Sequence, residues 1–321
     1  MIHCYLYQAS GELELQVPME RMRQALADPH ALLWVDIEDP EDEEIECLLE
    51  VFELHPLTVE DCIMPSPRPK LEEFEQYLFV ILQGLQRNEK GRLAPVELDC
   101  CVGRNFLITV RSQPIKALEE AQARIEKKSP ILKRGADFLF YSLADALIDS
   151  YFPILEEMEC RVDELETRLL ENSTKQILVD LFGIYNELMT LRRTLAPQRD
   201  ILSRLNRGDL QFITSSNSIY FRDIYDHLLR MSDLVDGCRE VTTMALEAHA
   251  TMVSNRLNEI MKSMTAMATL SVPLILITGV YGMNFGENPE LGPRWLYHGL
   301  SAACLLAVPV MLYYFRKYRW L

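Results

Sequence analysis

The sequence predicts an α+β membrane protein, and two observations support this fold class. The first is a pair of apolar runs, residues 264–284 and 295–315, that contain no Asp, Glu, Lys or Arg. Runs of about 20 such residues are long enough, as helices, to cross a hydrocarbon core about 30 Å thick. The second is the long segment before them, in which strand and helix patterns alternate. We therefore expect an N-terminal α/β/α domain and a long stalk helix that continues into the first of two transmembrane helices.

The N-terminal segment, residues 1–145, mixes short strands with helices. Short apolar runs bounded by turn formers indicate strands, and they occur at residues 1–7, 13–17, 32–37, 77–85, 100–102 and 105–110. Pro40 precedes residues 41–52, whose apolar positions follow helical spacing with acidic residues on the other face. Gly91 indicates a hairpin turn between two of the strands.

The next segment, residues 146–207, is predicted to be a helical hairpin. An amphipathic helix over residues 138–151 is expected to break at Pro153 and to resume over residues 154–170. A second helix over residues 175–205 would run back beside it, because only the short link Asn172–Thr174 joins the two.

A single long helix follows as the stalk, residues 208–263, and the first span, residues 264–284. Helical patterning runs from Ser218 to Tyr281 and is interrupted only by Gly237 and Pro273, with N-cap candidates in residues 215–218. At about 1.5 Å per residue this helix would be roughly 95 Å long. Its small and apolar seam suits partner helices, so we expect an oligomer. The members of that seam are Ile224, Leu228, Met231, Val235, Cys238, Thr242, Ala245, Ala248 and Met252.

Charge fixes the expected orientation and excludes one class of partner. The loop 285–294 carries acidic residues, whereas the tail 316–321, after the second span at 295–315, carries Arg316, Lys317 and Arg319. Positive flanks stay in the cytoplasm, so both termini are expected there. The net charge of −16 gives no support to nucleic-acid binding through a basic face. An acidic surface attracts cations, and it equally serves ordinary solubility.

The cysteines and the N-terminus are consistent with a cytoplasmic location for the large domain. The eight cysteines form no C-x-x-C pair, so neither a zinc knuckle nor a disulfide framework is indicated, and a reducing compartment fits. The first residues show no signal-peptide pattern.

The first apolar run and its flanks carry a resemblance to a known family. Asn258–Lys262, Tyr281–Phe285 and Pro289–Leu291 look like the corresponding parts of the CorA family of divalent-cation channels. The triplet Gly282-Met283-Asn284 is that family's signature, and its position at the end of the penultimate span makes it specific. The resemblance implies a funnel-shaped homopentamer in an inner membrane, which carries Mg²⁺ and Co²⁺ across the lipid bilayer.

Positions in and before the first span recur every three or four residues and therefore share one helix face. They are Asn258, Met261, Met264 or its neighbour Thr265, Ala268, Val272, Ile275 and Gly279. The resemblance implies that this face lines the pore, where apolar constrictions gate by dewetting. Spacing alone equally allows a face buried against neighbouring helices. The family often has threonine where this chain has Ile275, which leaves ion preference open.

The signature triplet Gly282-Met283-Asn284, at the outer end of the first span, suits a hydrated ion. Mg²⁺ dehydrates reluctantly, so a selectivity filter would hold its water shell through outer oxygens. The Asn284 side chain and the carbonyls of Gly282 and Met283 would form such a ring, and Glu287 and Glu290 in the loop would concentrate cations near it. The alternative, a C-cap that ends the helix, is compatible with this role.

Two further segments, residues 54–61 and 220–227, also resemble the family and imply a cytoplasmic sensor. By match, Asp61 and Asp223 would hold a regulatory Mg²⁺ across a subunit boundary and favour the closed state. A family histidine corresponds to Ser66, which argues against a second ion nearby. The alternative is that each aspartate makes an ordinary surface ion pair. The scattered histidines are interpreted as surface or capping residues.

The sequence thus predicts a Mg²⁺/Co²⁺ channel that is driven by membrane potential and closed by cytoplasmic Mg²⁺. One alternative is a zinc transporter of the same superfamily, and another is a membrane-tethered scaffold that conducts nothing. Enzyme activity is not expected, because no nucleophile–base constellation or phosphate-binding loop is present in the sequence.

Overall fold

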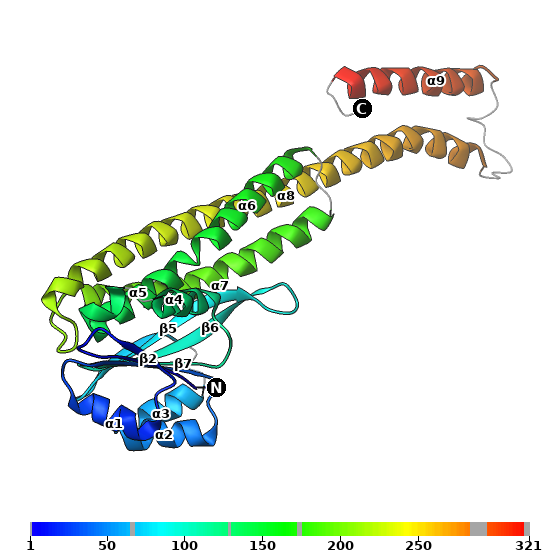
Figure 1. The fold of residues 1–321 in the computed structure, drawn as a ribbon. Coiled ribbons are helices and arrows are strands. Elements are labelled where there is room, and N and C mark those ends of the chain that lie inside the picture. The colour runs from blue at the N-terminus through cyan, green and yellow to red at the C-terminus, as the bar shows by residue number, and fades with distance from the viewer. Residues whose placement is uncertain (1, 65–67, 128–129, 172–174, 283–293, 318–321) are drawn as a thin grey trace. The chain divides into compact units, whose positions relative to one another are not determined.

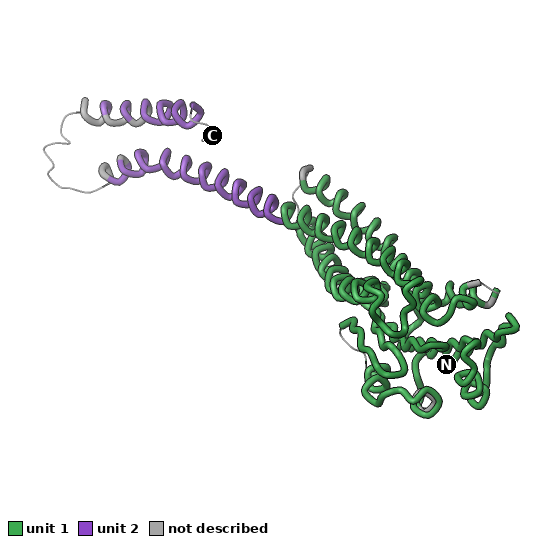
Figure 2. The backbone as a smooth tube through the Cα atoms, turned by 90° about the vertical axis from the view of Figure 1, so that its left-hand side faces the viewer, with its two compact units in different colours: residues 1–245 green, residues 246–321 purple. Residues whose placement is uncertain are grey.

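The computed structural model describes residues 2–64, 68–127, 130–171, 175–282 and 294–317 (Figure 1). Two compact units divide the chain, Met1–Ala245 and Leu246–Leu321 (Figure 2). The first unit contains the mixed α/β part and the helical hairpin, and the second contains the apolar C-terminal helices.

The described part of the first unit forms one seven-stranded mixed sheet in the order β2-β1-β3-β7-β6-β5-β4. β3 and β7 are parallel, and the other neighbouring strands are antiparallel. The strands are β1 Ile2–Tyr7, β2 Leu13–Leu15, β3 Leu32–Glu38, β4 Lys70–Glu73, β5 Leu78–Arg87, β6 Leu93–Val102 and β7 Phe106–Arg111. The expected strands are confirmed, and β4 is an additional one.

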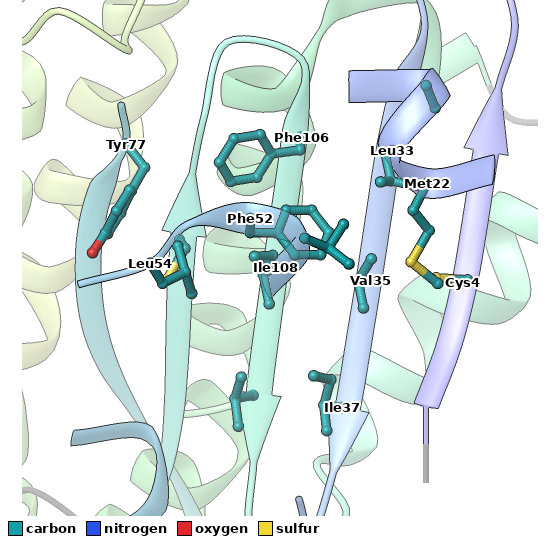
Figure 3. Packing of buried hydrophobic residues seen from close by; sticks show 14 of the residues in the cluster. Cys4, Met22, Leu33, Val35, Ile37, Phe52, Leu54, Tyr77, Phe106 and Ile108 are labelled. Carbon is teal, nitrogen blue, oxygen red and sulfur yellow. The ribbon is translucent and has the colours of Figure 1, made fainter. Parts of the chain in front are cut away.

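Helices cover both faces of this sheet, as expected for an α/β/α domain (Figure 1). On one face lie α1 (Met19–Ala27), α2 (Asp42–Phe52) and α3 (Pro56–Ile63), and the core between them and the sheet is apolar. Figure 3 shows Phe52 and Leu54 packed over Val35 and Ile108 of the central strands. Because β3 is covered on both sides, Leu32 to Ile37 are all buried, and all of them are apolar except Asp36.

The opposite face carries α4 (Lys116–Glu126), a short 3₁₀ turn η1 (Pro130–Arg134), α5 (Ala136–Asp149) and α7 (Lys175–Asn206). α6 (Phe152–Glu171) packs antiparallel to α7, which confirms the predicted hairpin. Buried Tyr151 marks the corner between α5 and α6. Its hydroxyl donates to the carbonyl of Gln83 and accepts a hydrogen bond from Gln198 Nε2 at 2.9 Å. The predicted break is confirmed and lies just before Pro153, because α5 ends at Asp149 and α6 begins at Phe152. Pro153 therefore lies in the first turn of α6, where no backbone donor is required.

α8 is a continuous helix from Ser215 to Gly282. The single long helix that was expected is confirmed, and Gly237 and Pro273, where the helical pattern of the sequence is interrupted, both lie inside it. The serines at 215–218 form its first turn. Asp137 of α5 fixes the approach to this turn, because its carboxylate accepts hydrogen bonds from Thr214 N at 2.9 Å and Thr214 Oγ1 at 2.7 Å.

The seam of α8 that was expected to meet partner helices is used partly within the chain itself. Phe221, Ile224, Leu228, Met231 and Val235 are buried in a single copy. Phe140 of α5 lies against Phe221, with ring centroids 5.6 Å apart. Thr242 and Ala245 of the seam are also buried. The seam therefore stabilises the first unit as far as Ala245, and its role between copies remains a prediction.

The second unit contains the C-terminal part of α8 and α9 (Arg294–Lys317), which coincides with the predicted second span. Among the described residues, two helical segments are long and apolar enough to cross a membrane, Ala136–Leu169 and Ser215–Leu276. α9, whose side chains are described only in part, is not one of them. Half of the apolar window in the first segment is buried, so we interpret it as core helices α5 and α6. Only 6% of the apolar window in the second segment is buried, as expected for a helix that lipid or other copies cover.

The sheet ends in two short strands, β2 and β4. Three of the four residues of β4 are charged, Lys70, Glu72 and Glu73. Its backbone and side chains are also occupied, because Leu71 O accepts a hydrogen bond from Arg204 Nη1 at 3.1 Å and Glu73 accepts one from Gln211 N at 3.1 Å.

Candidate metal centre

Three metal-ligating side chains of the first unit lie together. Asp145 and Asp149 are one turn apart on α5 and therefore share a face, and His227 comes from α8. One ligand atom of each lies within 4.8 Å of the others. His227 Nδ1 and Asp149 Oδ1 are 3.6 Å apart.

The electrostatics of this cluster favour a cation. Burial raises the pKa of Asp145 to about 6, and the negative charge of Asp149 adds to this effect, whereas His227 opposes it. Exposed Asp223 also raises the pKa of Asp145. Burial, followed by the charges of Asp145, Asp223 and Asp149, raises the pKa of Tyr141 to about 12. These anionic groups repel one another, and a divalent cation among them would relieve the repulsion.

The His227 ring has an available nitrogen. Its Nδ1 is buried and has no hydrogen-bond partner among the described residues. The ring meets Phe152 edge to face, with centroids 5.8 Å apart, and this contact holds its orientation. Carboxylates suit Mg²⁺, and imidazole also suits Co²⁺ and Zn²⁺, so the set fits a divalent metal ion.

The sequence-predicted sensor residues are placed differently. Asp61 Oδ2 pairs with Lys70 Nζ at 2.5 Å, which is the ordinary ion pair considered as the alternative. Burial lowers the pKa of Lys70, but the hydrogen bond and charge of Asp61 outweigh this effect and raise it overall. Asp223 lies on α8, and its negative charge raises the pKa of Asp145. A bridge from Asp61 to Asp223 requires a second copy and stays a prediction.

The predicted pore face is open in a single copy. Its members are all exposed, namely Asn258, Met261, Met264, Thr265, Ala268, Val272, Ile275 and Gly279. No described residue buries this face, so both interpretations, a pore lining and burial against the helices of other copies, stay predictions. Gly282 ends α8, whereas Met283, Asn284, Glu287 and Glu290 lie outside the described residues.

Sequence reasoning missed the centre formed by Asp145, Asp149 and His227. The four-residue spacing of the two aspartates was a signal, but nothing local in the sequence pointed to a histidine on a distant helix. The capping interpretation is confirmed at His55, whose Nδ1 accepts a hydrogen bond from Leu57 N at 3.2 Å. It is wrong at His227, whose Nδ1 is buried beside Asp149.

Comparison with known proteins agrees with these features. A family model described as "CorA-like Mg2+ transporter protein" matches residues 29–317. The putative metal ion transporter YfjQ of Bacillus subtilis is 34% identical over 322 residues, which cover 100% of this chain and 98% of that protein. The cobalt/magnesium transport protein CorA of Thermotoga maritima is 35% identical, over 85% of this chain and 78% of that protein.

A solved structure and a further relative extend the comparison. The complete structure of the CorA magnesium transporter from Methanocaldococcus jannaschii superposes with a TM-score of 0.83 at 26% identity, and covers 100% of this chain and 99% of that one. The zinc transport protein ZntB of Photorhabdus laumondii is 25% identical, over 80% of this chain and 78% of that protein.

The mixed α/β unit, the exposed apolar helices and the cluster of cation ligands are features of a membrane transporter for divalent cations. The family model spans most of the chain, and the match to YfjQ is full length. The chain belongs to the CorA family.

Proposed function

We propose that this chain forms a homopentamer in an inner membrane and conducts Mg²⁺, and also Co²⁺, into the cytoplasm along the membrane potential. The observation that carries the proposal is the exposed face of α8 from Asn258 to Gly279, which its own chain leaves uncovered. Copies arranged around an axis would cover this face and enclose a path. Gly282, Met283 and Asn284 form the selectivity filter of that path, and Glu287 and Glu290 concentrate cations at its outer end.

The same proposal places the first unit and both termini in the cytoplasm, because the basic tail after α9 remains on that side. Zinc transport is a second candidate. It is favoured by Ile275, which places an apolar side chain on the pore face, and by the similarity to a zinc transport protein. The third candidate function is that of a membrane-tethered scaffold that conducts no ion.

Ion uptake into proteoliposomes distinguishes these candidates. The purified chain is reconstituted, an inside-negative potential is applied, and Mg²⁺, Co²⁺ and Zn²⁺ are tested in parallel against protein-free liposomes. We expect Mg²⁺ and Co²⁺ to enter. Entry of Zn²⁺ alone would move the protein to the zinc branch, and entry of no ion would favour the scaffold.

We further infer that cytoplasmic Mg²⁺ closes this path. The ion binds among Asp145, Asp149 and His227 beside Asp223, and in the assembly Asp223 also meets Asp61 of a neighbouring copy. Lys70 competes with the ion for Asp61, because it already neutralises that carboxylate within one chain. Loss of the ion leaves like charges facing one another, which loosens the closed state.

Protection from protease measures this regulation. We expect Asp223→Asn to raise the Mg²⁺ concentration for half-maximal protection by about tenfold, in the range seen when groups supporting a metal site are lost. Lys70→Met should lower it, because Asp61 is then available to the ion. Asp200→Asn, at a position whose side chain is 78% exposed, is the control. Midpoints that do not move in either variant would remove the sensor role.

A further inference from the structure

A small cavity in the first unit lies apart from the Asp145 cluster and has no role in the proposed transport. It lies where α3 approaches β6 and the chain that follows β3 and β7, and its volume is about 90 Å³. A single water needs roughly 10–15 Å³ of such space, so the cavity has room for an ion with its first ligands. Its lining consists of Asp39, Pro40, Cys62, Ile63, Glu97, Asp99 and Ser112.

Asp99 is the unusual member of this lining. Its side chain is 4% exposed, and its Oδ1 has no hydrogen-bond partner among the described residues. A buried polar atom without a partner is costly, so such atoms commonly indicate a bound water or ion. None of the residues that line the cavity is a lysine, arginine or histidine that could neutralise the carboxylate.

The neighbours of Asp99 make this environment one that favours cations. Burial raises the pKa of Asp99 well above its usual range, and Cys62, Glu97 and Asp61 raise it further. Glu97 also shares a hydrogen bond with Asp99, so the two carboxyl groups are in contact. A divalent cation between the two carboxyl groups would relieve the repulsion between their charges.

We propose that this cavity binds one thiophilic divalent cation, of the Zn²⁺ or Co²⁺ class, through the carboxylates of Asp99 and Glu97 and the sulfur of Cys62. A thiolate beside carboxylates suits these ions, whereas Mg²⁺ prefers oxygen ligands alone. Among the described residues, only the Asp145 cluster has three such atoms within 4.8 Å of one another. Binding through all three groups therefore requires the Cys62 side chain to move closer to the two carboxylates than it lies in this structure.

The position of Cys62 means that an ion in this cavity would connect two elements of the fold. Cys62 follows Asp61 directly on α3, so an ion in the cavity ties this helix to β6 at the residue beside the predicted sensor. The proposal does not depend on transport, since it rests on the cavity and the unpartnered oxygen.

Cobalt is the probe for the test, because a bound thiolate gives Co²⁺ a charge-transfer absorption in the near ultraviolet. The full-length protein in detergent is titrated with CoCl₂ under reducing conditions. We expect a band that saturates, that Zn²⁺ removes and that excess Mg²⁺ does not. Cys62→Ser should abolish the band, whereas Cys160→Ser, at an exposed thiol on α6, should retain it.

Two carboxylate variants complete the test. Asp99→Asn keeps the shape of a buried side chain and should weaken Co²⁺ binding by about tenfold or more, and Glu97→Gln should act likewise if the first variant fails to fold. Asp149→Asn should leave the band unchanged, which separates this site from the Asp145 cluster. A band that persists in Cys62→Ser, or affinity that is unchanged in the carboxylate variants, would overturn the proposal. Ion uptake by the wild-type protein is measured separately, so failure of one proposal does not hide the other.

Discussion

Replacing Asn284 by alanine should reduce Mg²⁺ uptake into proteoliposomes to that of protein-free vesicles. The ion keeps its first-shell waters, so the filter acts through oxygens that accept hydrogen bonds from those waters. Each lost hydrogen bond to a charged group costs about 1.5–3 kcal/mol. A ring of identical subunits loses one at every copy, so the total effect on ion entry is large.

The matched control is Asn288→Ala, which removes the same side chain four residues further along the loop. This variant should conduct like the wild type. Equal uptake by Asn284→Ala and the wild type would remove the selectivity role from Asn284. Loss of uptake in both variants would indicate a general defect of the loop.

Replacing Asp36 by alanine should lower the stability of the first unit by about 3–5 kcal/mol, the cost of leaving a buried charge without its partner. Asp36 is fully buried and accepts hydrogen bonds from Thr109 Oγ1 at 2.6 Å, Arg111 Nη2 at 3.1 Å and Gln122 Nε2 at 2.5 Å. Without it, the only ion-pair partner that the Arg111 guanidinium, which is 2% exposed, retains among the described residues is Glu38, at 2.9 Å.

Trp34 provides the measurement, because it is fully buried and donates a hydrogen bond to Thr109 Oγ1 at 3.1 Å. Its near-ultraviolet circular dichroism should be lost at a lower temperature in Asp36→Ala than in the wild type. Asp200→Ala, at an exposed site, should leave the midpoint unchanged. A midpoint for Asp36→Ala close to that of the control would show that Arg111 finds full compensation elsewhere.

Most of the sheet could be predicted from the sequence because burial leaves a strong pattern in it. β3 and β5 are apolar runs between turn formers, and the helical hairpin has long amphipathic repeats. The elements that were missed have weak patterns. α1 and α4 are short helices without a side-chain cap, and β4 is a polar edge strand whose assignment depends on pairing with β5.

Pro153, Gly237 and Pro273 each disfavour a helix interior by local propensity, but their outcomes differ. The helix breaks just before Pro153, which lies in the first turn of α6, where its missing donor has no cost. Gly237 and Pro273 lie inside the continuous helix α8, so their local preference does not end it.

The candidate sites differ in the same way. The face from Asn258 to Gly279 could be predicted because it lies on one helix with regular spacing. The centre of Asp145, Asp149 and His227 joins two helices that are distant in sequence, and only folding brings them together. The pairing of Asp61 with Lys70 likewise depends on β4, which the sequence did not reveal.

The two short edge strands have a consequence for how the protein avoids aggregation. An exposed strand edge offers unpaired backbone groups to any other extended chain, and short, charged edges block this kind of strand addition. β2 has three residues, and β4 combines charged side chains with contacts from Arg204 and Gln211. These edges therefore disfavour extension of the sheet into a neighbouring copy. Association between copies, which the proposed channel requires, is left to helix surfaces, and the first unit resists the intermolecular sheet formation that would compete with correct assembly.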